Sequence, residues 1–127
     1  MSSILSAFNK HLIEFIQDII RIFPEDKNLK ITLTALNTVR RINPKSIIVI
    51  WKKHITDKYK KEIAEGNPEF FIQKNYTEDI EGQADADNIL KAIEQLRSPI
   101  KDMGEDNKKK AIKYIQNLTK MTELYFA

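Results

Sequence analysis

The sequence contains no cysteine, only three glycines and only two histidines among its 127 residues. The absence of cysteine excludes disulfide bonds, cysteine-based zinc sites and a thiol nucleophile, and it fits a reducing, intracellular setting. Three glycines cannot build a phosphate-binding loop, and none lies in a P-loop or dinucleotide-binding pattern. His11 and His54 have no second histidine at helical spacing, so an HExxH-type metal site is excluded and we expect both at the edge of a core.

Catalytic constellations are also missing. A serine nucleophile requires a histidine and an acid around it, and Ser46 and Ser98 show no such surroundings in the sequence. The acidic residues near position 80 lack the EF-hand order of glycine and glutamate, so a solvated loop or a counter-surface for basic residues is favoured over a cation site. These acidic residues are Glu78, Asp79, Glu81, Asp85 and Asp87. We therefore predict that the protein is not an enzyme and has no catalytic residue, cofactor or metal.

Long apolar runs are absent as well. No run approaches the roughly 20 residues that a membrane span requires. Residues 1–15 have no basic region followed by an apolar core, so we interpret them as part of the fold rather than as a signal peptide. A chain of this length suits one domain with a real hydrophobic core, and we predict a single helical domain over residues 1–127.

Charge is present in both signs but is unevenly distributed. The net charge is only +3. Residues 1–39 are neutral, and residues 40–61 hold eight basic side chains and one acidic, which gives +7. Residues 62–90 hold one basic and eight acidic side chains, which gives −7, and residues 91–127 return to +3. Adjacent blocks of opposite sign indicate a surface with separate basic and acidic regions.

Apolar residues recur every three or four positions over residues 3–23, which predicts an amphipathic helix that Pro24 ends. Its apolar face is broad, so a core helix is favoured over a two-stranded coiled coil. A second helix is predicted over 27–42, capped by Asp26 or Asn28. Its expected apolar face consists of Leu29, Leu33, Ala35, Leu36, Val39 and Ile42.

The stretch SIIVIW, residues 46–51, has the composition of a buried strand but the spacing of a helix. Helical geometry from Pro44 places apolar side chains on one face without a break, with Trp51 at its centre. Asn43 and Pro44 form a helix start, and Gly66 is a suitable C-terminal cap. We therefore predict a helix over 44–65 with Trp51 in the core. The predicted face is Ile47, Ile48, Trp51, Ile55 and Tyr59, with Ile63 at its edge.

The remaining chain predicts a short helix over about 68–75, an acidic surface loop over about 75–87 and a helix over 85–98 that Pro99 either kinks or ends. A last helix is predicted over about 107–125, with Asp106 as its cap. The predicted fold is all-α, a compact single-domain bundle of about five main helices plus a short one.

Three stretches resemble a group of small uncharacterised proteins encoded by giant viruses, the nucleocytoplasmic large DNA viruses. They are FNKHLIEFIQDIIRIFPEDKNL (8–29), INPKSIIVIWKKHITDKYKKEIAEGN (42–67) and FFIQKNYTEDI (70–80). The resemblance covers about residues 8–80 and transfers no functional residue. It implies a viral protein that acts in the host cytoplasm, in the virus factory or in the virion.

The basic block contains the candidate binding patch. On a helix that starts at Pro44, its four lysines fall in one arc beside the apolar face, with Thr56 among them. The alternatives are a solvated face for the lysines and, for the two arginines, stabilisation of a helix C-terminus. The candidate residues are Arg40, Arg41, Lys45, Lys52, Lys53 and Lys60.

We hypothesise a non-enzymatic viral interaction module that binds a viral or host protein, as a virion component or as an adaptor. The alternative is non-specific binding of nucleic acid by residues 40–61. Self-association through the two charge blocks is a further expectation, in which apolar surface would have to stabilise a dimer.

Overall fold

The computed structural model describes residues 3–67, 69 and 84–127. Of these residues, 87% are helical and none lies in a strand, so the predicted compact all-α fold is confirmed. The elements are α1 (Ser3–Ile22), α2 (Lys27–Ile42), α3 (Ser46–Trp51), the π-helix η1 (Lys52–Thr56), α4 (Asp57–Ala64), α6 (Ala84–Asp102) and α7 (Glu105–Tyr125). Within the described ranges, no helix is both long and apolar enough to cross a membrane.

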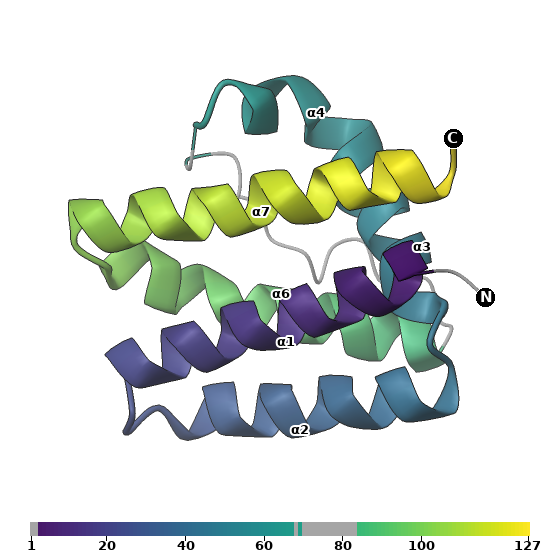
Figure 1. The fold of residues 1–127 in the computed structure, drawn as a ribbon. Coiled ribbons are helices and arrows are strands. Elements are labelled where there is room, and N and C mark those ends of the chain that lie inside the picture. The colour runs from purple at the N-terminus through teal and green to yellow at the C-terminus, as the bar shows by residue number, and fades with distance from the viewer. Residues whose placement is uncertain (1–2, 68, 70–83) are drawn as a thin grey trace.

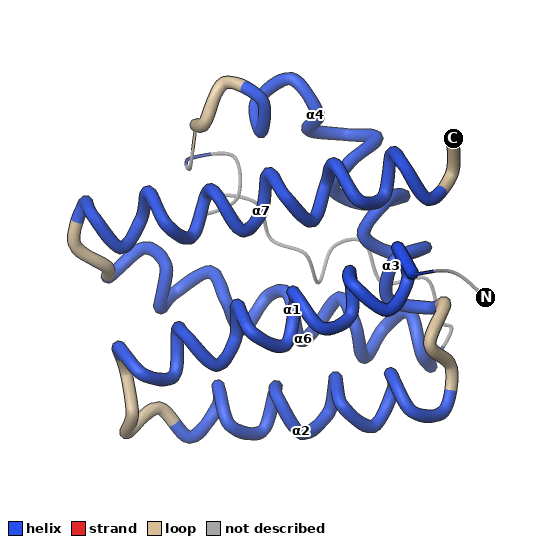
Figure 2. Tube along the Cα trace, viewed as in Figure 1, coloured by secondary structure: helices blue, strands red, loops and turns tan. Residues whose placement is uncertain are grey.

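Four long helices lie roughly side by side and form the body of the fold. α1 packs against α2 and α7, and α2 packs against α6. α3 and η1 cross the end of these helices where α1 begins and α7 ends, and α4 then runs back over α7 (Figure 1). Short loops join α1 to α2, α2 to α3 and α6 to α7 (Figure 2). The helix ends that these loops connect therefore lie close together at the two ends of the bundle.

The core is built around Trp51, which is fully buried as predicted. The edge of its ring meets Phe8 of α1, with ring centroids 6.1 Å apart. Its indole Nε1 donates a hydrogen bond to Oγ1 of Thr119 in α7, at 3.3 Å. Trp51 thus joins α3 to α1 and to α7.

Residues 46–51 form a helix, as their apolar spacing predicts. The helix begins at Ser46 rather than at Pro44, and the amide and the hydroxyl of Ser46 both donate hydrogen bonds to the carbonyl of Asn43. The predicted C-terminal cap is confirmed at Gly66, whose φ is +72°. Gly66 donates to the carbonyl of Ile63, and residue 67 donates to residue 62, which is the pairing of a Schellman motif.

The helix over 46–64 is not uniformly α-helical. Residues 52–56 are wound as a π-helix, in which the amide of Asp57 donates to the carbonyl of Lys52. Tyr59 then leaves helical geometry, with φ −129° and ψ 18°. The wider turn places three consecutive residues, His54, Ile55 and Thr56, on the buried side. The prediction that Thr56 lies among the exposed lysines is therefore wrong: its hydroxyl lies 2.7 Å from that of Thr122.

Several further details differ from the sequence prediction. Ile42, expected in the core, is 76% exposed. It is the last residue of α2, and the last buried residue of that helix is Val39. α6 continues through Pro99, so the proline does not end it. It begins at Ala84, one residue before the predicted helix over 85–98, so residues 84–87 do not belong to the acidic loop predicted over about 75–87. α7 is capped by Gly104, which leaves Asp106 in its first turn. The short helix over 68–75 and the rest of the acidic loop lie outside the described residues, apart from residue 69.

Candidate functional site

The six candidate basic residues lie along the end of the bundle where α2 passes into α3. Arg40 and Arg41 lie in the last turn of α2, and Lys45 lies in the turn before α3. Lys52 and Lys53 lie in η1. Lys60 lies in α4, beyond the break in helical geometry at residue 59. The five candidate residues other than Lys60 are therefore close to one another in the chain. We call these five residues the basic surface: Arg40, Arg41, Lys45, Lys52 and Lys53.

Two of these residues, Arg40 and Lys45, line one groove with a volume of about 670 Å³. The other groove residues are Leu5, Ser6, Asn9, Pro44 and Tyr125. The side-chain amide of Asn9 donates to the carbonyl of Pro44 at 3.0 Å and so fixes the turn before α3 against α1. Neither Arg40 nor Lys45 forms an ion pair within residues 3–67, 69 and 84–127, and both are exposed. The groove therefore has two uncompensated positive charges in its wall.

The charges of Lys52 and Lys60, by contrast, are paired. Nζ of Lys52 lies 3.0 and 3.1 Å from the two carboxylate oxygens of Asp57, and 5.6 Å from the centre of the Phe126 ring. Nζ of Lys60 lies 2.8 Å from the carboxylate of Glu123, whose hydrogen bond and charge raise the pKa of Lys60. Exposed pairs of this kind contribute little to stability. Lys52 and Lys60 are therefore paired, whereas Arg40 and Lys45 at the groove are not paired with any described residue.

Large apolar side chains are exposed among these charges. Ile42 follows the two arginines directly and is 76% exposed. Val49 is 43% exposed, and helical spacing places it on the same face as Lys45, four residues earlier, whose carbonyl accepts from its amide. Phe126, beneath Lys52, is 42% exposed. Their sequence positions indicate no functional role for any of them, although the helical phase directs Val49 away from the face that contains Trp51.

The histidines lie in or beside the core. His54 is 3% exposed within η1. His11 is half-buried, with its ring centroid 4.7 Å from that of Tyr114, and burial lowers its pKa. In the part of the chain that the structure describes, no three histidine, aspartate or glutamate side chains are grouped so that they could hold a metal ion.

Comparison with known proteins identifies no relative: no family model matches the chain, and no curated protein or solved structure matches it.

Proposed function

We propose that the protein is a non-enzymatic helical interaction module whose basic surface, together with Ile42 and Val49, binds an acidic and amphipathic segment of a partner protein. The observation that supports this proposal is the exposure of these two apolar side chains among cations. Protein interfaces combine apolar contacts with a charged rim, whereas phosphate contacts require only the cations. The resemblance of residues 8–80 to proteins of giant viruses supports an infected cell or a virion as the setting.

The surface is suited to this role because its parts are fixed before a partner binds. Arg41 and Ile42 lie on α2, and Val49 lies on α3. The hydrogen bond between Asn9 and Pro44 holds the connecting turn against α1. A preorganised surface loses little conformational entropy on binding, so modest contact area can give measurable affinity.

Binding of a labelled acidic amphipathic helical peptide, measured by fluorescence anisotropy, tests the proposal. We expect Ile42→Ser combined with Val49→Ser to weaken binding about tenfold or more, because both apolar contacts are lost. Ile31→Ser is the matched control, since Ile31 is also exposed on α2, at 65%, but lies outside the surface. Equal affinities for the double variant and the control would contradict the proposal.

The second candidate is non-specific binding of single-stranded nucleic acid. The groove favours it, because Tyr125 lies in the same groove as Arg40 and Lys45 and offers a ring for base stacking beside two cations. Affinity that rests on phosphate contacts falls steeply with salt, by about tenfold or more between about 50 mM and 200 mM. An interface that depends on Ile42 and Val49 is less sensitive to salt. Parallel titrations of the peptide and of an oligonucleotide at both salt concentrations distinguish the two candidates.

Self-association through the charge blocks stays a prediction. Part of the basic block is already compensated within the chain, by Asp57 and Glu123. Sedimentation that shows only monomer at micromolar concentration, independent of salt, would contradict it.

A further inference from the structure

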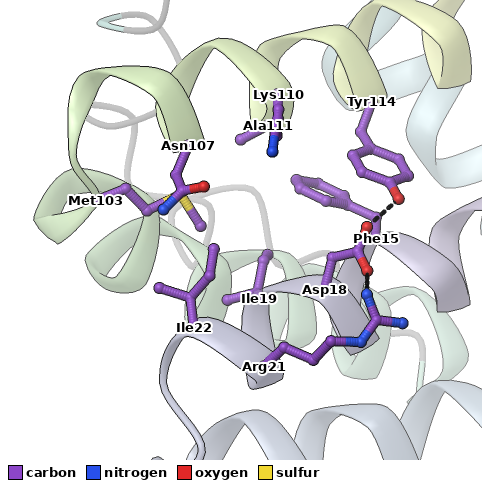
Figure 3. Close-up of a pocket in the computed structure, with 10 residues that line it drawn as sticks. All are labelled: Phe15, Asp18, Ile19, Arg21, Ile22, Met103, Asn107, Lys110, Ala111 and Tyr114. Carbon is purple, nitrogen blue, oxygen red and sulfur yellow. Dashed lines mark hydrogen bonds and ion pairs between the residues drawn. The ribbon is translucent and has the colours of Figure 1, made fainter.

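A cavity of about 230 Å³ lies at the end of the bundle opposite to α3, between the second half of α1 and the first half of α7 (Figures 1 and 3). Its apolar lining consists of Phe15, Ile19, Ile22, Met103 and Ala111. Its polar lining consists of Asp18, Arg21, Asn107, Lys110 and Tyr114. None of these residues belongs to the basic surface, so an inference about the cavity is independent of the proposed function.

One wall of the cavity is held in place by its own contacts. The ring of Tyr114 stacks on Phe15, with centroids 4.9 Å apart and planes inclined by 16°. The hydroxyl of Tyr114 donates a hydrogen bond to the carboxylate of Asp18, which also pairs with Arg21 (Figure 3). Burial, and then the hydrogen bond to Asp18, raise the pKa of Tyr114 to about 12. At neutral pH this wall therefore presents a neutral phenol and a carboxylate whose charge Arg21 compensates.

The remaining charge at the cavity is positive. Lys110 forms no ion pair with any residue that the structure describes. Lys110 lies on α7 one turn after Asn107, and both residues line the cavity (Figure 3). An ammonium and an amide on one side of a cavity are donors that suit a carboxylate. Asp18 lines the same cavity and disfavours a ligand with a second negative charge.

The volume limits the size of the ligand. A cavity of about 150 Å³ lined by apolar side chains holds a benzene molecule, and a water occupies about 30 Å³ in the liquid. A cavity of about 230 Å³ therefore has room for one ring or one branched aliphatic group and a carboxylate. We infer that this cavity binds a small monocarboxylate, with its carboxylate at Lys110 and Asn107 and its apolar part against Ile19, Ile22 and Met103.

Benzoate is the probe, added to the full chain and followed through the backbone amide signals of Asn107, Lys110 and Ala111 in ¹H–¹⁵N NMR spectra. We expect saturable shifts at these residues, with a Kd of about 1 mM or lower. Benzyl alcohol has the same ring without the charge, and it should bind about tenfold more weakly because the charge-assisted hydrogen bond is absent.

Two variants test the role of the lysine. Lys110→Met should weaken benzoate binding about tenfold and leave benzyl alcohol binding unchanged. Lys109→Met is the matched control, since Lys109 is an exposed neighbour on α7 that does not line the cavity. Both variants change exposed side chains and should remain folded, which circular dichroism checks. Shifts that do not saturate, or equal benzoate affinities of the two variants, would overturn the inference.

Discussion

The two ends of the helical bundle differ in how many of their charged side chains are paired with an opposite charge. At the end where α2 passes into α3, Arg40 and Lys45 line a groove without a carboxylate partner among the described residues. At the other end, Asp18 accepts a hydrogen bond from Tyr114 and pairs with Arg21 beside a smaller cavity. α1 and α7 contribute residues to both ends. One pair of helices therefore supports an open cationic surface and a cavity whose charges are largely compensated.

This difference is consistent with the different sizes of the two ligands that we propose for the two ends. Uncompensated cations beside exposed apolar side chains suit an extended acidic partner, because each contact is individually weak and many are required. A cavity with a rigid wall and a single unpaired lysine suits a small ligand with one charge. Both ends depend on the core between them, and a change in that core is expected to have the largest effect.

Replacement of the central core residue, Trp51→Ala, should destabilise the protein by about 3–5 kcal/mol, because it removes a fully buried ring and leaves a cavity between α3, α1 and α7. Chemical denaturation followed by circular dichroism measures the change. Trp51→Phe is the control, since it retains an apolar ring and loses the hydrogen bond to Thr119. Its destabilisation should be clearly smaller. A loss of less than about 1 kcal/mol for Trp51→Ala would contradict the central position of this residue.

The positions of most helices could be predicted from the sequence because their apolar residues follow one regular period. α2 begins and ends at the predicted residues, and α1 ends one residue before the predicted end. Gly66 could be predicted as a cap because a left-handed residue closes many helices. The π-helix could not be predicted, since its extra residue per turn changes the phase within a sequence that still fits an α-helix. This change of phase explains why Thr56 is buried and why Lys52 reaches Asp57, five residues later.

The candidate sites were harder to predict because they depend on contacts between helices. The charge of residues 40–61 is visible in the sequence, but the pairing of Lys60 with Glu123 requires α4 to pack on α7. The groove lies where the turn before α3 meets α1, and Asn9 and Pro44, which form a hydrogen bond there, are 35 residues apart in the chain. The exposure of Ile42 depends on what lies opposite the end of α2, and apolar periodicity does not contain that information.

At the cavity end, Tyr114→Phe should lower stability by about 1 kcal/mol at neutral pH, because the hydrogen bond to Asp18 is lost. The effect should depend on pH in a defined direction. The pKa of Tyr114 is raised to about 12, from an ordinary value of about 10 for the unfolded chain. The contribution of the phenol is therefore complete below about pH 10 and is lost as the pH rises through about 12.

Urea denaturation of both proteins at several pH values between neutral and about pH 12 measures this dependence. The stability difference between the wild type and Tyr114→Phe should shrink across the alkaline range. A constant difference from neutral pH to about pH 12 would show that the phenolic proton does not contribute. Contributions from other groups that lose protons in this range are common to the two proteins and cancel in the difference.

The smallest expected effect compares an uncompensated cation with a paired one. Lys45 lines the groove together with Arg40, so replacing it with glutamine removes repulsion and should raise stability slightly, by about 0.5 kcal/mol or less. Lys60→Gln loses the ion pair with Glu123 and should shift stability in the opposite direction. Both shifts should diminish as salt is added, since exposed charges are screened. Thermal denaturation of the two variants at low and high salt measures the contrast. If Lys45→Gln were the more destabilising substitution at low salt, the groove would not be a region of uncompensated positive charge.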